Sequence, residues 1–102
     1  MPKLTTIYWR DIPAQVIGQQ GRTRHKQELE RRFALAIDRA AMRAGKGSSN
    51  LYLEEWRRES RPIEGDVEQA VRDEVARLEA AFPDDLLEAT VKNGGLRKPG
   101  SE

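Results

Sequence analysis

Apolar residues recur at helical spacing between residues 24 and 44, and this is the clearest periodicity in the chain. The spacing gives one apolar stripe, formed by Leu29, Phe33, Ala36, Ile37, Ala40, Ala41 and Ala44. Residues three, four or seven positions apart share one side of an α-helix, so the stripe predicts a long amphipathic helix over 24–44. Thr23 is suited to cap its start and Gly45 to end it.

A second apolar stripe predicts a helix over residues 67–82. It consists of Val67, Val71, Val75, Leu78 and Phe82. Asp66 precedes the stripe and is a favourable N-cap, and Pro83 cannot continue the helix. Asp84 is then suited to cap the start of a shorter helix that runs through Val91.

The segments between the N-terminus and the first helix have the composition of strands and turns. Residues 5–9 are β-branched and aromatic, which favours a strand, and residues 14–17 favour a second short strand. Between them, Pro13 predicts a bend because it lacks an amide hydrogen and restricts the residue before it. The two strands form a predicted hairpin, followed by a glycine-bracketed loop over 18–22.

Residues 51–58 fit two structures. As a strand, Tyr52, Glu54 and Trp56 share one face; as a helix, Asn50 caps the start and Tyr52 stacks over Trp56. We favour the strand, because a two-stranded hairpin alone is marginally stable and a third strand would help to cover the long helix. Residues 46–50 and 61–65 are expected to be loops.

These elements predict a single α+β domain over residues 3–95. We expect a small, mainly antiparallel sheet in the order β-β-α-β-α, with two main helices on one face and a short C-terminal helix. Residues 96–102 are expected to form a flexible tail. A chain of 102 residues has the length of one domain, not two.

Composition excludes several chemistries. The chain has no cysteine and a single histidine, His25, so we expect no disulfide, thiolate metal site or cysteine nucleophile, and no bound metal or other cofactor. No serine lies in a nucleophile-elbow motif, and we identify no catalytic residue. No apolar run is long enough to span a membrane. We expect a cytoplasmic, non-enzymatic protein.

The small net charge of +1 hides an asymmetry between the two halves of the chain. Residues 1–50 carry ten Lys or Arg against four Asp or Glu, whereas residues 51–102 carry eight against thirteen. The predicted start of the first helix holds a basic cluster within 22–32, centred on Arg22, Arg24, Lys26 and Arg31. If the charges separate on the surface, this cluster would attract an anionic partner, either an acidic protein or a nucleic acid.

Three sequence strings resemble one known family. They are YWRDIPAQVI at residues 8–17, AIDRAAMR at 36–43 and YLEEWRR at 52–58. With Arg32 and Phe33, these strings are similar to the small bacterial "virulence factor" domain family over residues 3–95. The resemblance implies a conserved accessory or interaction domain, and it brings no catalytic residues with it.

We therefore expect a non-enzymatic accessory domain that binds a protein partner. The candidate surface is the hairpin bend with its flanking aromatic residues: Tyr8, Arg10, Asp11, Ile12 and Trp56. A structural role for the same string is the competing interpretation, with Arg10 paired locally and the aromatic residues in the core. The alternative functions are nucleic-acid binding through the Arg22–Arg32 cluster, and service as an accessory subunit of a cofactor-dependent enzyme system. We expect no membrane association.

Overall fold

The computed structural model of the chain describes residues 2–45 and 49–96 and contains a four-stranded antiparallel sheet flanked by helices. The α+β class predicted from the sequence is confirmed. The sheet order is β3-β2-β1-β4, so the N-terminal hairpin lies in the middle and both edge strands pair with it. The strands are β1 (Lys3–Trp9), β2 (Ile12–Gln20), β3 (Thr23–Glu28) and β4 (Trp56–Pro62).

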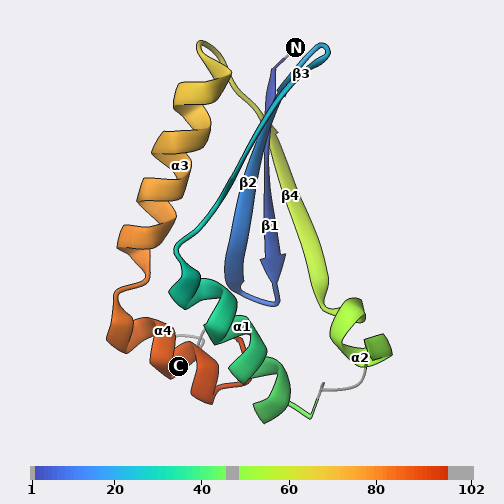
Figure 1. Cartoon of the computed structure of the whole chain (residues 1–102), viewed down its shortest axis with the longest axis vertical. Coiled ribbons are helices and arrows are strands. Elements are labelled where there is room, and N and C mark those ends of the chain that lie inside the picture. Colours follow the sequence, from blue (N-terminus) through green and yellow to red (C-terminus); the bar gives the residue numbers. More distant parts are fainter. Residues whose placement is uncertain (1, 46–48, 97–102) are drawn as a thin grey trace.

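The helices lie beside the sheet and at one of its ends. Figure 1 shows the longest helix, α3, running along the sheet, while the other helices gather where β1 turns into β2. The helices are α1 (Arg31–Arg43), α2 (Ser49–Glu54), α3 (Val67–Ala81) and α4 (Asp84–Lys92).

The first predicted helix is correct only in its second part. Residues 23–28 form the edge strand β3, so Thr23 begins a strand and does not cap a helix. Helix α1 begins at Arg31, with Glu30 at its N-cap position. All six side chains of β3 are polar and only His25 is half-buried, which leaves no alternation of apolar residues for a sequence reading to detect. A turn at Gly21, where φ is +58°, returns the chain from β2 to β3. The predicted loop over 18–22 is correspondingly shorter.

The segment over 51–58 combines the two structures that the sequence left open. Residues up to Glu54 belong to the short helix α2, and β4 then runs from Trp56 to Pro62. The predicted strand is therefore wrong for its first half, and it begins and ends later than expected. The helical alternative is right about the aromatic contact, because the Tyr52 and Trp56 rings meet edge to face at 5.7 Å.

The predicted second helix is confirmed as α3, and it packs closely on the sheet. The Asp66 side chain accepts a hydrogen bond from the Glu68 amide at 3.1 Å and so caps the start. Gly18 on β2 allows the close approach, because a Cβ there would stand 2.5 Å from Val67 and 2.7 Å from Val71. The final helix is also present, although Pro83, not Asp84, occupies its N-cap position.

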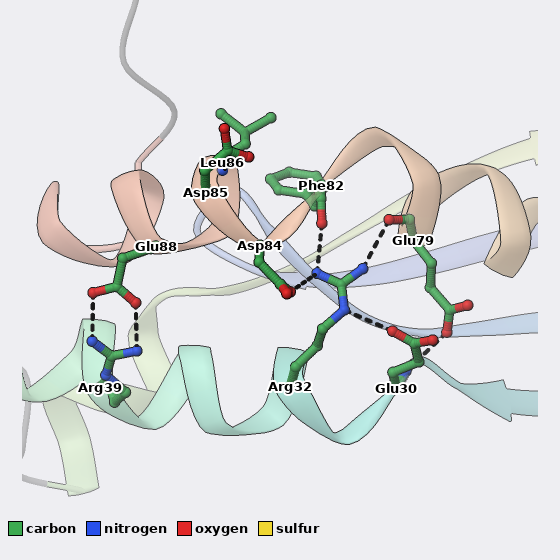
Figure 2. A network of polar contacts seen from close by, with 9 residues as sticks. All are labelled: Glu30, Arg32, Arg39, Glu79, Phe82, Asp84, Asp85, Leu86 and Glu88. Carbon is green, nitrogen blue, oxygen red and sulfur yellow. Dashed lines mark hydrogen bonds and ion pairs between the residues drawn. The ribbon is translucent and has the colours of Figure 1, made fainter.

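Helix α1 is fastened to the junction of α3 and α4 by arginines (Figure 2). The Arg32 guanidinium donates to the carbonyl oxygens of Phe82 and Glu79 at 2.5 and 2.9 Å, and it pairs with two carboxylates, Glu30 and Asp84. Two turns further along, Arg39 makes a bidentate ion pair with Glu88 at 2.6 and 2.7 Å. These contacts hold α1 against α3 and α4 at the end of the sheet that the helices cover. The predicted tail falls outside the described residues, except for Leu96.

Candidate binding surface

Several hydrogen bonds and an ion pair hold the hairpin bend against the rest of the fold. Arg10 has a positive φ of +54°, and its amide donates to the Glu55 carbonyl at 3.1 Å. Its guanidinium donates to the Gly94 carbonyl at 3.0 Å and pairs with the Glu55 carboxylate at 3.3 Å. The Asp11 amide reaches the Gly95 carbonyl at 2.9 Å. The bend therefore joins the hairpin to the start of β4 and to the C-terminal turn.

Part of the YWRDIPAQVI string, including Ile12 and Trp9, lies in the core. Ile12 and Trp9 have exposed fractions of 0%, so neither offers a surface to a partner. The Trp9 indole nitrogen donates to the Tyr52 carbonyl at 2.8 Å, and the two rings stack at 5.8 Å. Ile12 is therefore not part of the candidate surface. Arg10 stabilises the bend through contacts within the fold. The stacking of Trp9 on a nucleic-acid base is excluded by the same burial.

Tyr8 and Asp11 remain half-exposed, and they border a shallow groove of about 330 Å³ between β4 and α3. The Arg57 guanidinium lies over the Tyr8 ring at 4.4 Å and pairs with both Asp11 and Glu59. Burial raises the pKa of the Tyr8 hydroxyl above 10.0, and the carboxylates of Glu59 and Glu74 raise it further. At neutral pH the hydroxyl is therefore protonated and is not an activated nucleophile.

A second ion-pair cluster adjoins this groove at Arg77, which also lines it. Glu74 on α3 is 7% exposed and receives two hydrogen bonds from Arg77 and a third from Arg61. The hydrogen bonds from Arg77 hold the pKa of Glu74 below 4.5, against the opposing effect of burial. Each of these cations has a carboxylate beside it. The groove is consequently close to electrical balance, and it has no free charge with which to attract a ligand.

The predicted basic cluster has a different setting. Arg22 lies on the turn between β2 and β3, Arg24 and Lys26 on β3, and Arg31 at the start of α1, and all four side chains are exposed. Arg32, which bounds the cluster in the sequence, belongs to the α1–α4 fastening (Figure 2). The sequence placed Arg24 and Lys26 on a helix, but they lie on an edge strand.

Strand register brings two further cations to Arg24 and Lys26. Because side chains alternate along a strand, Arg24 and Lys26 face away from the side on which α3 packs. On this side, Arg24 lies in one row across the sheet with Gln19 and Lys3, and Lys26 with Ile17, Thr5 and Ser60. The next row runs from Glu28 through Gln15 and Ile7 to Arg58. We call this surface the basic sheet face and define it by Lys3, Arg24, Lys26 and Arg58.

Sequence reasoning missed Lys3 and Arg58. Their membership depends on which strand pairs with which, and the register places Lys3 opposite Gln19 and Arg58 opposite Ile7. The only local signal is the alternation in RRESR at residues 57–61, which sends Arg58 to one face and Arg57 to the other. The hydrogen bond of 2.8 Å between the Thr5 and Ser60 hydroxyls confirms that β1 and β4 present these positions on a common side.

The cations of the basic sheet face lack carboxylate partners. Within residues 2–45 and 49–96, Lys3, Lys26, Arg24 and Arg58 form no ion pair and no side-chain hydrogen bond, and the same holds for Arg22 and Arg31. The remaining described arginines all donate to a carboxylate or a carbonyl: Arg10, Arg32, Arg39, Arg43, Arg57, Arg61, Arg72 and Arg77. Four of these unpaired cations, Lys3, Arg24, Lys26 and Arg58, thus share one side of the sheet.

A pocket of about 450 Å³ lies where the basic sheet face meets the helical end of the molecule. Tyr52 and Trp56 form one wall, and Leu29 and Ile37 contribute further apolar surface. Its polar lining residues are Gln15, Glu28, Arg31 and Asp38. Burial raises the pKa of the Tyr52 hydroxyl above 10.0, and the nearby Asp38 carboxylate adds to the effect. Trp56, a predicted binding residue, is therefore half-exposed at a pocket on the side of the sheet away from Tyr8.

The described residues contain no group of three or more His, Cys, Asp and Glu side chains placed to hold a metal ion. None of the described helices is long and apolar enough to cross a membrane.

Comparison with known proteins gives one match. No curated protein and no solved structure matches the chain. The family model described as "Virulence factor" matches residues 7–91, which span both the hairpin bend and α4. This match confirms the resemblance carried by the YWRDIPAQVI string. The chain belongs to the virulence factor family.

Proposed function

We propose that this domain is a non-enzymatic interaction module that binds an acidic segment of a protein partner on its basic sheet face. The observation that carries the proposal is the unequal pairing of charges. Apart from Arg31, the arginines on the helices and around the Tyr8 groove are paired, whereas Arg24, Lys26 and Arg58 are exposed without partners. Unpaired like charges repel one another, and an anionic ligand relieves that repulsion.

The opposite side of the sheet has no such excess of unpaired cations. Helix α3, which packs there, carries four carboxylates and two arginines, and the arginines pair with Glu68 and Glu74. The acidic half of the sequence therefore does not neutralise the basic sheet face. An approaching acidic chain would be steered to one side of the domain and turned to a preferred orientation.

A protein segment fits this side better than a nucleic acid. The carboxylates of Glu28 and Asp38 stand at the pocket beside the basic sheet face, where they would repel the regularly spaced charges of a phosphate backbone, whereas a peptide can place an uncharged side chain there. The centre of the face holds Ile7 and Ile17, not the aromatic residues on which bases stack. Of the two aromatic residues that line the pocket, only Trp56 belongs to a strand of the sheet. A peptide can mix acidic, neutral and apolar side chains to match this pattern.

Binding can be measured on the full chain by fluorescence anisotropy with two labelled probes: a short peptide of alternating Glu and Ser, and a single-stranded oligonucleotide of mixed sequence and equal charge. We expect the peptide to bind at low salt and to lose affinity as salt is added, because exposed charges are screened. The triple variant Arg24→Glu, Lys26→Glu, Arg58→Glu should weaken peptide binding about tenfold or more.

The matched control reverses three exposed cations on the helices: Arg43, Arg72 and Lys92. It changes the net charge by the same amount, so equal losses in both triple variants would show a net-charge effect and refute the basic sheet face as the site. No binding of either probe would refute the proposal. Tighter binding of the oligonucleotide than of the peptide, lost in the sheet-face triple variant, would replace the protein partner with a nucleic acid.

A further inference from the structure

The pocket at the end of the basic sheet face is formed before any ligand arrives. Its aromatic wall is fixed because Tyr52 stacks on the fully buried Trp9, and the Trp9 indole donates to the Tyr52 carbonyl at 2.8 Å. Trp56 meets Tyr52 edge to face at 5.7 Å and starts β4, where it pairs with Trp9. A wall held in this way needs little ordering on binding, which favours affinity.

The pocket has room for a bulky apolar side chain and an apolar lining on which to pack it. Its volume of about 450 Å³ lies within the range of ligand sites and is larger than one side chain, so an anchor would fill part of it. Leu29 and Ile37 form apolar lining opposite the aromatic wall, and both are buried in the core below. Ala34 stands at the exposed side of the pocket on α1. Anchoring pockets of this kind, beside a polar contact surface, contribute most of the affinity in many protein interfaces.

We infer that this pocket takes a leucine-sized or aromatic side chain of the same acidic segment that the basic sheet face binds. The inference rests on the proposed function and defines the partner more narrowly: an extended acidic peptide with one apolar anchor. Charge and shape agree on this occupant. The basic sheet face selects the acidic part, and the pocket fits the apolar part without needing a charge of its own.

Strand geometry sets the spacing between the anchor and the acidic residues. Glu28 lines the pocket, Lys26 lies two residues from it along β3, and Arg24 lies four residues from it. At about 3.4 Å per residue, these cations stand roughly 7 and 14 Å along the strand from the pocket margin. An extended peptide has a similar rise per residue, so its acidic side chains should lie about two and four positions from the anchor.

The test uses three synthetic peptides of equal charge with the full chain, again by fluorescence anisotropy. One peptide has Glu two and four positions from a leucine, the second has alanine in place of the leucine, and the third moves the leucine beside the acidic residues. We expect the first to bind about tenfold to a hundredfold more tightly than the second, the range for burial of one such side chain. The third should bind more weakly than the first.

A variant that fills the pocket provides the protein-side test. Ala34→Trp adds a large side chain at an exposed lining position of α1, and Ala76→Trp makes the same change at an exposed position of α3, away from the pocket. Ala34→Trp should reduce binding of the leucine peptide to the level of the alanine peptide and leave the alanine peptide unchanged. Ala76→Trp should alter neither. Circular dichroism and thermal unfolding of both variants establish that the fold is kept.

The two proposals fail in different ways. If all three peptides bind equally, respond to the triple variant of the basic sheet face and ignore Ala34→Trp, the anchor pocket is refuted and the proposed function stands. If the leucine peptide binds but the triple variant has no effect, the proposed function is refuted and the pocket acts alone. If no peptide binds, both are refuted. If an oligonucleotide competes with the leucine peptide, and Ala34→Trp abolishes this competition, the pocket binds a nucleic-acid base and the apolar anchor is refuted.

Discussion

Replacing Arg10 tests whether the hairpin bend is held by structure or offered to a partner. The guanidinium is 16% exposed, donates to the Gly94 carbonyl and pairs with Glu55, so Arg10→Ala leaves a carbonyl and a carboxylate without this partner. Hydrogen bonds to charged groups contribute about 1.5–3 kcal/mol. Partial exposure places the expected loss of unfolding free energy toward the lower end of that range, at about 1.5–2 kcal/mol.

Arg10→Gly removes the same contacts but also relieves the positive φ of +54°. A non-glycine residue in this region costs about 1–2 kcal/mol, and glycine loses about 0.4–1 kcal/mol through the freer unfolded chain. Arg10→Gly should therefore be about 0.5–1 kcal/mol more stable than Arg10→Ala. Urea unfolding of the wild type and both variants, with a common m-value, measures the difference. Wild-type stability in Arg10→Ala would refute the fastening role, and a less stable glycine variant would refute the backbone argument.

The remaining predictions concern packing and acid stability. Gly18→Ala should lower the unfolding free energy by about 1–3 kcal/mol, because its Cβ would stand 2.5 Å from Val67. If this clash is the cause, the double variant with Val67→Ala should lose less stability than the sum of the two single variants. Strict additivity would contradict this cause. Phe33→Ala should cost about 3–5 kcal/mol, since Phe33 is 1% exposed; an unchanged denaturation midpoint would show that it is not in the core. The lowered pKa of Glu74 stabilises the fold above its ordinary value of 4.5, and this contribution is lost as the pH falls through the folded-state pKa. Glu74→Gln should therefore flatten the acid limb of a stability–pH curve, and an unaltered acid limb would refute the assignment.

The predictable parts of the fold are those in which side chains alone set the structure. The apolar stripe through Phe33 and Ile37 fixed the buried side of α1, and Asp66 marked the start of α3. Strand β3 gave no such signal, because an exposed edge strand needs no apolar alternation and is held by backbone hydrogen bonds to β2. The same charged residues are equally compatible with the first turns of a helix, which explains the wrong start at Thr23.

The residues of the candidate site were likewise predictable only in part. Composition was enough to find Arg24 and Lys26, because they cluster in the sequence. Lys3 and Arg58 come from β1 and β4, and only the pairing of those strands brings them beside the cluster. The role of Arg10 depends on a backbone angle and on a carbonyl 84 residues away, and neither leaves a local trace in the sequence. Long-range register is therefore what the sequence could not supply.

Charge alone cannot make the basic sheet face a tight binding site. Exposed ion pairs contribute about 0–1 kcal/mol each, so Lys3, Arg24, Lys26 and Arg58 together offer at most about 4 kcal/mol. Ordering four long side chains costs about 0.5–1.5 kcal/mol apiece, which cancels most of that gain. The cations can speed and orient the encounter, and they make it sensitive to salt. Net affinity must then come from burial of apolar surface, and the Tyr52–Trp56 pocket is the preformed place beside these cations where a partner can bury it.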